Sequence, residues 1–206
     1  MNLAELLVQS GVVVEKAAQI AGEVGNRYSE ADRYYHTLEH IVATLSVIES
    51  LQDKAQNPVA LKLAAWFHDV IYDAKAKDNE EQSAAYMRKV LGAAGVALAI
   101  IEQTERLILA TKTHQANDTD TDCQILLDAD LSILGSPAEE YETYRHKIRL
   151  EYAWVTEEQY QTGRIQVLEK FLQRARLYYT HPMYERYEVQ ARTNLRKEIQ
   201  SLSGKL

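Results

Sequence analysis

Apolar residues recur at intervals of three and four along almost the whole chain, and this spacing is typical of amphipathic helices. Leu38, Ile41, Leu45 and Ile48 form one such face. Only three prolines and eight glycines interrupt the 206 residues, and alternating apolar runs bounded by Asn-Gly or Asp-Gly turns do not occur. The sequence therefore predicts an all-α fold of about nine or ten helices.

Capping and helix-breaking residues set the expected helix boundaries. Pro58 suits a helix start, Asn79 is the expected N-cap of another helix, and Thr156 with Gln159 forms a capping box. The expected helices are about Leu3–Gln9, Val13–Val24, His36–Leu51, Pro58–Phe67, Asn79–Gly92, Val96–Thr111, Asp122–Gly135, Pro137–Trp154, Thr156–Tyr178 and Tyr184–Leu202. Because no linker, repeat or low-complexity tract divides this array, we predict a single compact domain over residues 1–206.

Charge and cysteine content narrow the functional classes. The formal net charge of -7 repels phosphate backbones, so broad nucleic-acid binding is not expected. The single cysteine, Cys123, allows no internal disulfide, and the first residues lack the basic and apolar regions of a signal peptide. No apolar run reaches the roughly 20 residues of a membrane span. We expect a cytoplasmic protein without membrane contact, and the sequence leaves a homo-oligomer open.

Two histidines one helical turn apart form the first candidate motif, Tyr35–His40. His36 and His40 lie at i and i+4, so they share one side of a helix. Imidazole is the commonest metal ligand among side chains and titrates near neutral pH. The alternative is a chance pair or a helix cap.

The second motif is an apolar run, Ala64–Phe67, that ends abruptly in His68-Asp69. Neither polar side chain belongs in a core without a partner. A histidine and a carboxylate together provide nitrogen and oxygen donors for a divalent ion. The alternative is an aspartate that hydrogen-bonds the histidine for structural reasons.

The third motif places two carboxylates, Asp128 and Asp130, in an otherwise apolar helix, Leu126–Leu134. Aspartate is unfavourable inside a helix, and the apolar neighbours of Asp130 suggest that it points inward. A buried carboxylate needs a partner, which is either a metal ion or an arginine.

Taken together, the order His40, then His68-Asp69, then Asp130 resembles the HD superfamily of metal-dependent phosphohydrolases. The segments Tyr35–His40, Trp66–Asp73, Asn79–Ala84 and Asp128–Leu131 are similar to a group described as predicted metal-dependent HD phosphohydrolases. The similarity extends almost to the chain end, at Arg192–Leu195. It implies an HD-type helical domain with a metal-site core at about residues 30–135 and C-terminal helices 137–202 packed on that core.

The resemblance also implies roles for individual residues. His40, His68, Asp69 and Asp130 would be the ligands of one divalent ion, whether Mn, Mg, Co, Ni, Fe or Zn. Tyr35-His36-x-x-x-His40 is similar to a motif of cyclic nucleotide phosphodiesterases, which would make His36 a general acid, although the rest of the chain does not resemble such a domain.

The run that begins at His68 is similar to the His-Asp-x-x-Glu-Asp motif of the enzymes that hydrolyse guanosine alarmones. This sequence has Tyr72 in place of the glutamate, which argues against alarmone hydrolysis. Asp73 is retained and is a candidate to orient water.

Further candidates concern a second ion and an anionic substrate. Two-metal members of the superfamily use additional histidines between the His-Asp pair and the last aspartate, and this sequence has only His114 there, which favours one ion. Guanidinium and ammonium groups recognise phosphate. The candidates for substrate binding are Arg33, Lys112, Arg149 and Arg164.

The predicted function is hydrolysis of a small phosphorylated metabolite or nucleotide by metal-activated water. Two alternatives stay open. One is a di-iron oxygenase of the same superfamily, which needs more histidine ligands. The other is a non-catalytic helical module that keeps a metal ion for structure or senses a ligand.

Overall fold

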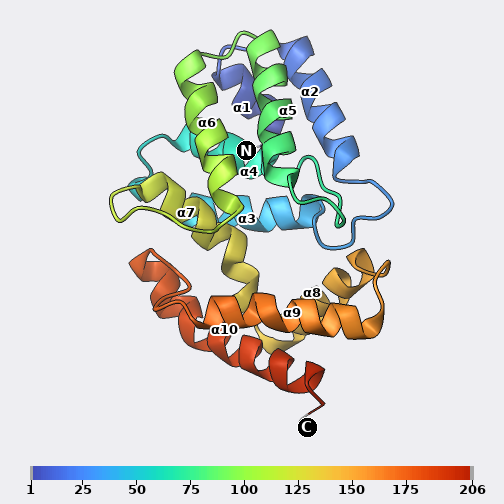
Figure 1. Cartoon of the computed structure of the whole chain (residues 1–206). Coiled ribbons are helices and arrows are strands. Elements are labelled where there is room, and N and C mark those ends of the chain that lie inside the picture. Colours follow the sequence, from blue (N-terminus) through green and yellow to red (C-terminus); the bar gives the residue numbers. More distant parts are fainter. Residues whose placement is uncertain (1, 205–206) are drawn as a thin grey trace. The chain divides into compact units, whose positions relative to one another are not determined.

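The computed structural model describes residues 2–204, and all regular structure in that range is helical (Figure 1). It contains ten α-helices and two short 3₁₀ helices, with no strand between residues 2 and 204. The prediction of an all-α chain with nine or ten helices is confirmed.

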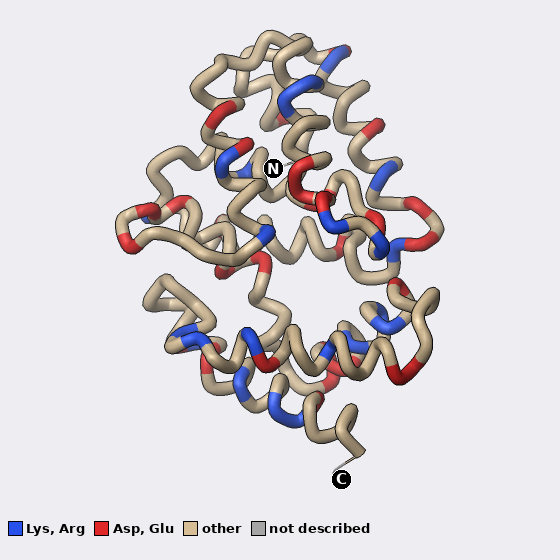
Figure 2. The backbone as a smooth tube through the Cα atoms, in the orientation of Figure 1, with Lys and Arg blue, Asp and Glu red and all other residues tan. Residues whose placement is uncertain are grey.

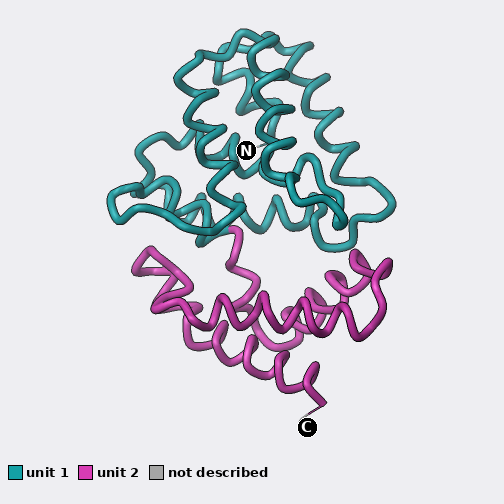
Figure 3. Tube along the Cα trace, in the orientation of Figure 1, with its two compact units in different colours: residues 1–129 teal, residues 130–206 magenta. Residues whose placement is uncertain are grey.

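The helices group into two compact units, residues 1–129 and residues 130–206 (Figure 3). The boundary falls close to the end of the metal-site core that we expected at about residues 30–135. Whether the C-terminal helices form one domain with that core stays a prediction.

Unit 1 consists of seven α-helices and one 3₁₀ turn. In chain order they are α1 (Leu3–Gln9), α2 (Val14–Arg27), α3 (Leu38–Ser50), η1 (Gln52–Lys54), α4 (Pro58–Phe67), α5 (Asn79–Ala93), α6 (Leu98–Thr111) and α7 (Thr121–Asp130). Helices α5 and α6 pack against each other, α6 and α3 both pack against α4, and α1 packs against α2. Asp130, the last residue of α7, is also the first residue of unit 2.

Helix α4 is buried on nearly every side, as its almost wholly apolar sequence requires. Asn57 caps its start by accepting a hydrogen bond from the backbone N–H of Ala60 at 3.1 Å, and Pro58 occupies the first turn as predicted. The carboxylate of Asp122 accepts from the backbone N–H groups of Gln56 and Asn57 at 2.7 and 2.9 Å, which ties the start of α7 to the start of α4. Helix α4 therefore has a fixed position, and it carries His68 at its C-terminal end.

Unit 2 consists of the 3₁₀ helix η2 (Leu131–Gly135) and the helices α8 (Ala138–Glu151), α9 (Glu157–Leu172) and α10 (His181–Leu202). Helix α10 packs against η2 and α9. The predicted capping box is present at the start of α9: the side chain of Thr156 accepts from the N–H of Gln159, and the side chain of Gln159 accepts from the N–H of Thr156.

Several predicted boundaries are wrong, each for a local reason. Helix α2 continues through Gly25 to Arg27, so the helix forms there despite the cost of a helical glycine, which is about 1 kcal/mol. Asn79 is the first residue of α5 rather than its N-cap, because its side chain pairs with the backbone of Asp73. Helix α10 begins at His181, because proline is tolerated in a first turn.

The charges are mixed along both units (Figure 2). Residues 1–129 contain 19 acidic and 11 basic side chains, whereas residues 130–206 contain 11 and 12. The net negative charge of the chain therefore resides in unit 1. Between residues 2 and 204, no helix combines the length and the apolar character that crossing a membrane requires.

Candidate metal centre

His68 follows the last residue of α4, and its orientation is fixed by two hydrogen bonds. Its backbone N–H donates to the carbonyl of Ala64 at 2.9 Å, and its Nδ1 lies 3.0 Å from the carbonyl oxygen of Ala65. A carbonyl oxygen can only accept, so Nδ1 carries the hydrogen and neutral His68 has a lone pair at Nε2. Metal-binding histidines are typically oriented in this way.

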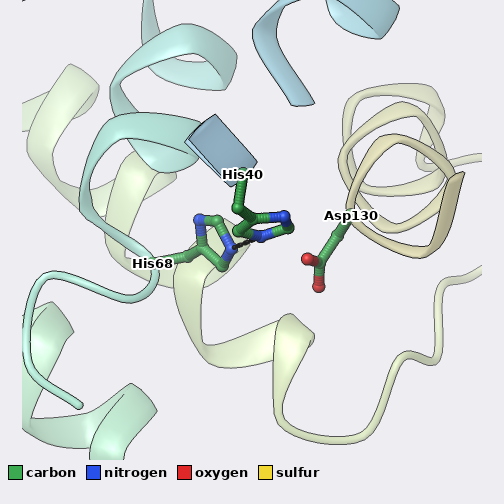
Figure 4. A group of neighbouring side chains, drawn as sticks. All are labelled: His40, His68 and Asp130. Atoms are coloured by element: carbon green, nitrogen blue, oxygen red, sulfur yellow. Dashed lines mark hydrogen bonds between the residues drawn. The ribbon is translucent and has the colours of Figure 1, made fainter. Parts of the chain in front are cut away.

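His40 is the third residue of α3, and its ring meets that of His68 (Figure 4). The Nε2 atoms of the two rings are 3.2 Å apart, and their planes are inclined at 65°. Both residues are almost inaccessible to solvent, at 6% and 1% exposure. Two buried nitrogens from remote parts of the sequence thus face each other.

Asp130 contributes the third donor of the group. One ligand atom from each of His40, His68 and Asp130 lies within 4.8 Å of the other two. In Figure 4 the ring of His40 lies between the ring of His68 and the carboxylate of Asp130. The sequence therefore predicted correctly that these three residues meet.

Asp69 lies next to the same two rings. Its Oδ2 is 3.1 Å from Nε2 of His68 and 3.6 Å from Nε2 of His40. Burial raises the pKa of Asp69, but the nearby His68, His36 and His40 outweigh it and hold that pKa below its usual range. The mutually close group consists of His40, His68 and Asp130, so Asp69 as a fourth ligand stays a prediction.

The distances between these donors fit a shared ion. Ligands of a transition-metal ion lie about 2.1 Å from it, so two ligands are about 3.0 Å apart at a right angle and about 3.4 Å apart at the tetrahedral angle. The separations of 3.1 Å between His68 and Asp69 and 3.2 Å between His68 and His40 lie within this interval, and the 3.6 Å between His40 and Asp69 is slightly longer. A neutral His68 directs a lone pair at the Asp69 carboxylate, and only a proton or a cation makes that contact favourable.

His36 lies beside this group, two residues before the first residue of α3, so the prediction that it shares a helix with His40 is wrong. Its ring stacks on that of Tyr72, with centroids 4.1 Å apart, and lies 6.0 Å from the ring of His40. Tyr35 contacts both histidine rings, at 5.0 and 4.9 Å. These aromatic neighbours were not predictable from the sequence, apart from Tyr72, which stands where the alarmone hydrolases have a glutamate.

The carboxylate of Asp73 is exposed and takes part in a local turn. It accepts a hydrogen bond from the backbone N–H of Lys75 at 2.8 Å, while the backbone of Asp73 pairs with Asn79. Its proposed role in orienting water stays a prediction that these contacts do not test.

His114 and Lys112 follow the end of α6. His114 has a left-handed backbone with φ of 50° and does not belong to the three-residue group. Lys112 forms an ion pair with Glu81 and donates to the carbonyl of Lys77 at 2.9 Å. His114 stays a candidate for a second metal ion or for substrate contact, and Lys112 stays a candidate for substrate contact.

The arginine candidates are engaged by protein groups. Arg33 is fully buried and donates to three backbone carbonyls. Arg149 pairs with Glu157 and donates to the carbonyl of Tyr152. Arg164 pairs with Glu198 in a buried cluster of unit 2. None of these contacts favours an open phosphate site.

Cys123 is buried, and this burial raises the pKa of its thiol to about 11. A thiol with such a pKa is protonated at neutral pH, which argues against a nucleophilic or metal-binding thiolate.

The fold and the site define an all-helical protein with a His/His/Asp group that can hold a metal ion. No family model, curated protein or solved structure matches this chain.

Proposed function

We propose that this chain is a metal-dependent phosphohydrolase of the HD type, in which His40, His68, Asp69 and Asp130 hold one divalent ion. One observation carries the proposal: the facing Nε2 atoms of His40 and His68, 3.2 Å apart, with aspartate oxygens close by. Two neutral imidazoles and two carboxylates leave such an ion without net charge. This donor set suits Mn, Fe, Co, Ni or Zn better than Mg, because imidazole prefers transition metals.

A bound divalent ion would lower the pKa of water to about 7 in a favourable site and would neutralise charge on a phosphoryl group. The histidines must be neutral to bind it, and the tautomer that the carbonyl of Ala65 imposes on His68 meets this requirement. His36 is the candidate proton donor to the leaving oxygen, held by the ring of Tyr72 beside the group.

The charge distribution favours an ion-dependent reaction with a small substrate. Unit 1 contains more acidic than basic side chains, so an anionic substrate meets a repulsive field there unless a cation reverses it locally. Arg33 does not supply that reversal, because its guanidinium group is buried and donates to backbone carbonyls. The substrate class is therefore a small phosphorylated metabolite or nucleotide.

The test is turnover by protein of defined metal content. Purified protein is stripped with a chelator, reloaded separately with Mn, Fe, Co, Ni, Zn or Mg, and incubated with nitrophenyl phosphate esters and a panel of nucleotides. Phosphate release is expected with at least one transition metal, and His68→Ala and Asp69→Ala are expected to abolish it.

His181→Ala serves as the control variant, because His181 is 77% exposed and lies outside the group. Turnover that survives in both site variants contradicts the assignment. Tight metal binding without turnover on any ester favours the non-catalytic module, and two irons with an optical signal favour the oxygenase.

A further inference from the structure

The end of helix α4 is held by an unusually complete set of hydrogen bonds. The last four carbonyls of a helix have no partner within it. In α4 each of them accepts a bond from elsewhere: Ala64 from the N–H of His68, Ala65 from Nδ1 of His68, Trp66 from the hydroxyl of Tyr28 and Phe67 from the N–H of Val70. The segment that carries His68 is thereby fixed in place.

Arg33 continues this pattern into the turn that follows. Its Nη1 donates to the carbonyl of Asp69 at 2.6 Å and to that of His36 at 3.3 Å, and its Nη2 donates to the carbonyl of Val70 at 3.0 Å. Its Nε pairs with Glu30 at 3.2 Å. Arg33 thus joins the backbone of the first histidine motif to that of the second.

The surroundings of Arg33 suit a rigid role. The side chain is completely inaccessible to solvent, and the guanidinium carbon lies 5.2 Å from the ring of Tyr28 and 5.7 Å from that of Tyr72. A cation at this point also faces the negative end of the α4 dipole. A planar guanidinium can reach three carbonyls at fixed angles, whereas the single nitrogen of lysine cannot.

We infer that Arg33 is a positioning residue of this centre: by holding the carbonyls of His36, Asp69 and Val70 together, it sets the separation between His68, Asp69 and the first histidine motif. The effect of Arg33 on metal binding rests on the proposed function. The positioning itself depends only on the hydrogen bonds of Arg33 to backbone carbonyls. It replaces a substrate-binding role for Arg33.

A second arginine provides a matched control. Arg192 on α10 also pairs with a glutamate, Glu188, at 2.7 Å. It donates to three backbone carbonyls, those of Leu172, Arg174 and Ala175, at 3.1, 2.7 and 3.2 Å. Its contacts therefore reproduce those of Arg33 within unit 2, without any residue of the His/His/Asp group.

The experiment compares Arg33→Lys with Arg192→Lys by two measurements. The first is the 15N NMR spectrum of the histidine rings in metal-free protein, which reports the tautomer of His68. The second is titration with Co(II), read by its visible absorption. Because loss of a group that supports a ligand typically weakens metal binding about 10- to 100-fold, we expect that loss, and changed ring signals, in Arg33→Lys alone.

Every outcome decides the inference. Ring signals in Arg33→Lys that match those of the wild type overturn the positioning role, whatever the metal result. Changed ring signals in a protein that never binds Co(II) support the positioning role and refute the proposed function. Equal changes in both arginine variants show a general loss of stability and overturn the inference. If Arg33→Lys does not fold, Arg33→Met and Arg192→Met, which keep much of the apolar stem, are measured in the same way.

Discussion

Binding of a divalent ion should stabilise the folded chain, and removal of one donor should abolish that gain. A ligand at 100 times its dissociation constant stabilises a protein by about 2.7 kcal/mol. For a chain of this length, each kcal/mol raises the melting temperature by roughly 2–4 °C. The wild type is therefore expected to melt about 5–11 °C higher with saturating metal than with chelator.

His68→Gln is the most informative perturbation of this gain. Nε2 of His68 lies 3.2 Å from Nε2 of His40 and 3.1 Å from Oδ2 of Asp69, whereas those two atoms are 3.6 Å from each other, so His68 lies between them. Its loss should weaken binding by about 100-fold or more, because even loss of a supporting group costs 10- to 100-fold. At the same metal concentration the gain then falls to about 0.4 kcal/mol, or roughly 1 °C.

The assay is thermal unfolding followed by circular dichroism, with and without each metal. Glutamine at position 68 can keep a hydrogen bond to the Ala65 carbonyl, so the metal-free variant should lose only about 1 kcal/mol. His181→Gln removes an exposed imidazole and should keep the full gain. A gain of wild-type size in His68→Gln and in Asp130→Asn would refute the ligand assignment.

Three further predictions concern pH and packing. Because the pKa of Asp69 is held below its usual range, its carboxylate stabilises the folded state above about pH 4, and this contribution is lost as the pH falls further. In urea unfolding, metal-free wild type should be more stable than Asp69→Asn at pH 6, and this difference should shrink steadily as the pH falls below 4. Asp122→Ala leaves two backbone N–H groups without their acceptor and should cost about 3 kcal/mol in the same assay. Gly135→Ala should cost about 1–3 kcal/mol, because the added methyl would stand 2.5 Å from Cβ of Tyr187, whereas Gly163→Ala meets nothing within 4 Å and should be neutral or stabilising.

Helix positions were largely predictable because periodicity and capping act locally. Pro58 and Thr156 begin helices as expected, since a fixed φ and a side-chain cap depend only on neighbouring residues. The end of α9 was not predictable: the chain leaves the helix at Leu172, six residues before the expected end. The segment that follows is held by Glu188 and Arg192 of α10, and such tertiary hydrogen bonds leave no trace in local sequence.

The ligand residues were predictable for a different reason. Histidine and aspartate inside apolar segments are costly unless a partner compensates them, so His68 and Asp130 stood out from their neighbours. The residues around the group did not stand out, because tyrosine and arginine are ordinary on amphipathic helices and loops. Tyr28 and Arg33 contact backbone that is remote in the sequence, and Tyr35 contacts the rings of His36 and His40, so their roles become visible only in the structure.

The positions of these polar groups in their helices explain why the site tolerates two buried histidines and a partly buried aspartate. Each lies at a helix end or in an adjoining turn: His68 after α4, His40 in the first turn of α3, Asp130 at the end of α7. Helix ends have carbonyl or N–H groups without partners, so they can orient a polar side chain at little cost to the helix itself. His68 is oriented in this way: its Nδ1 donates to a carbonyl at the end of α4, and its Nε2 is directed at the other donors. A metal centre assembled from helix ends therefore needs little strain, only the convergence of three helices that the buried α4 helps to fix.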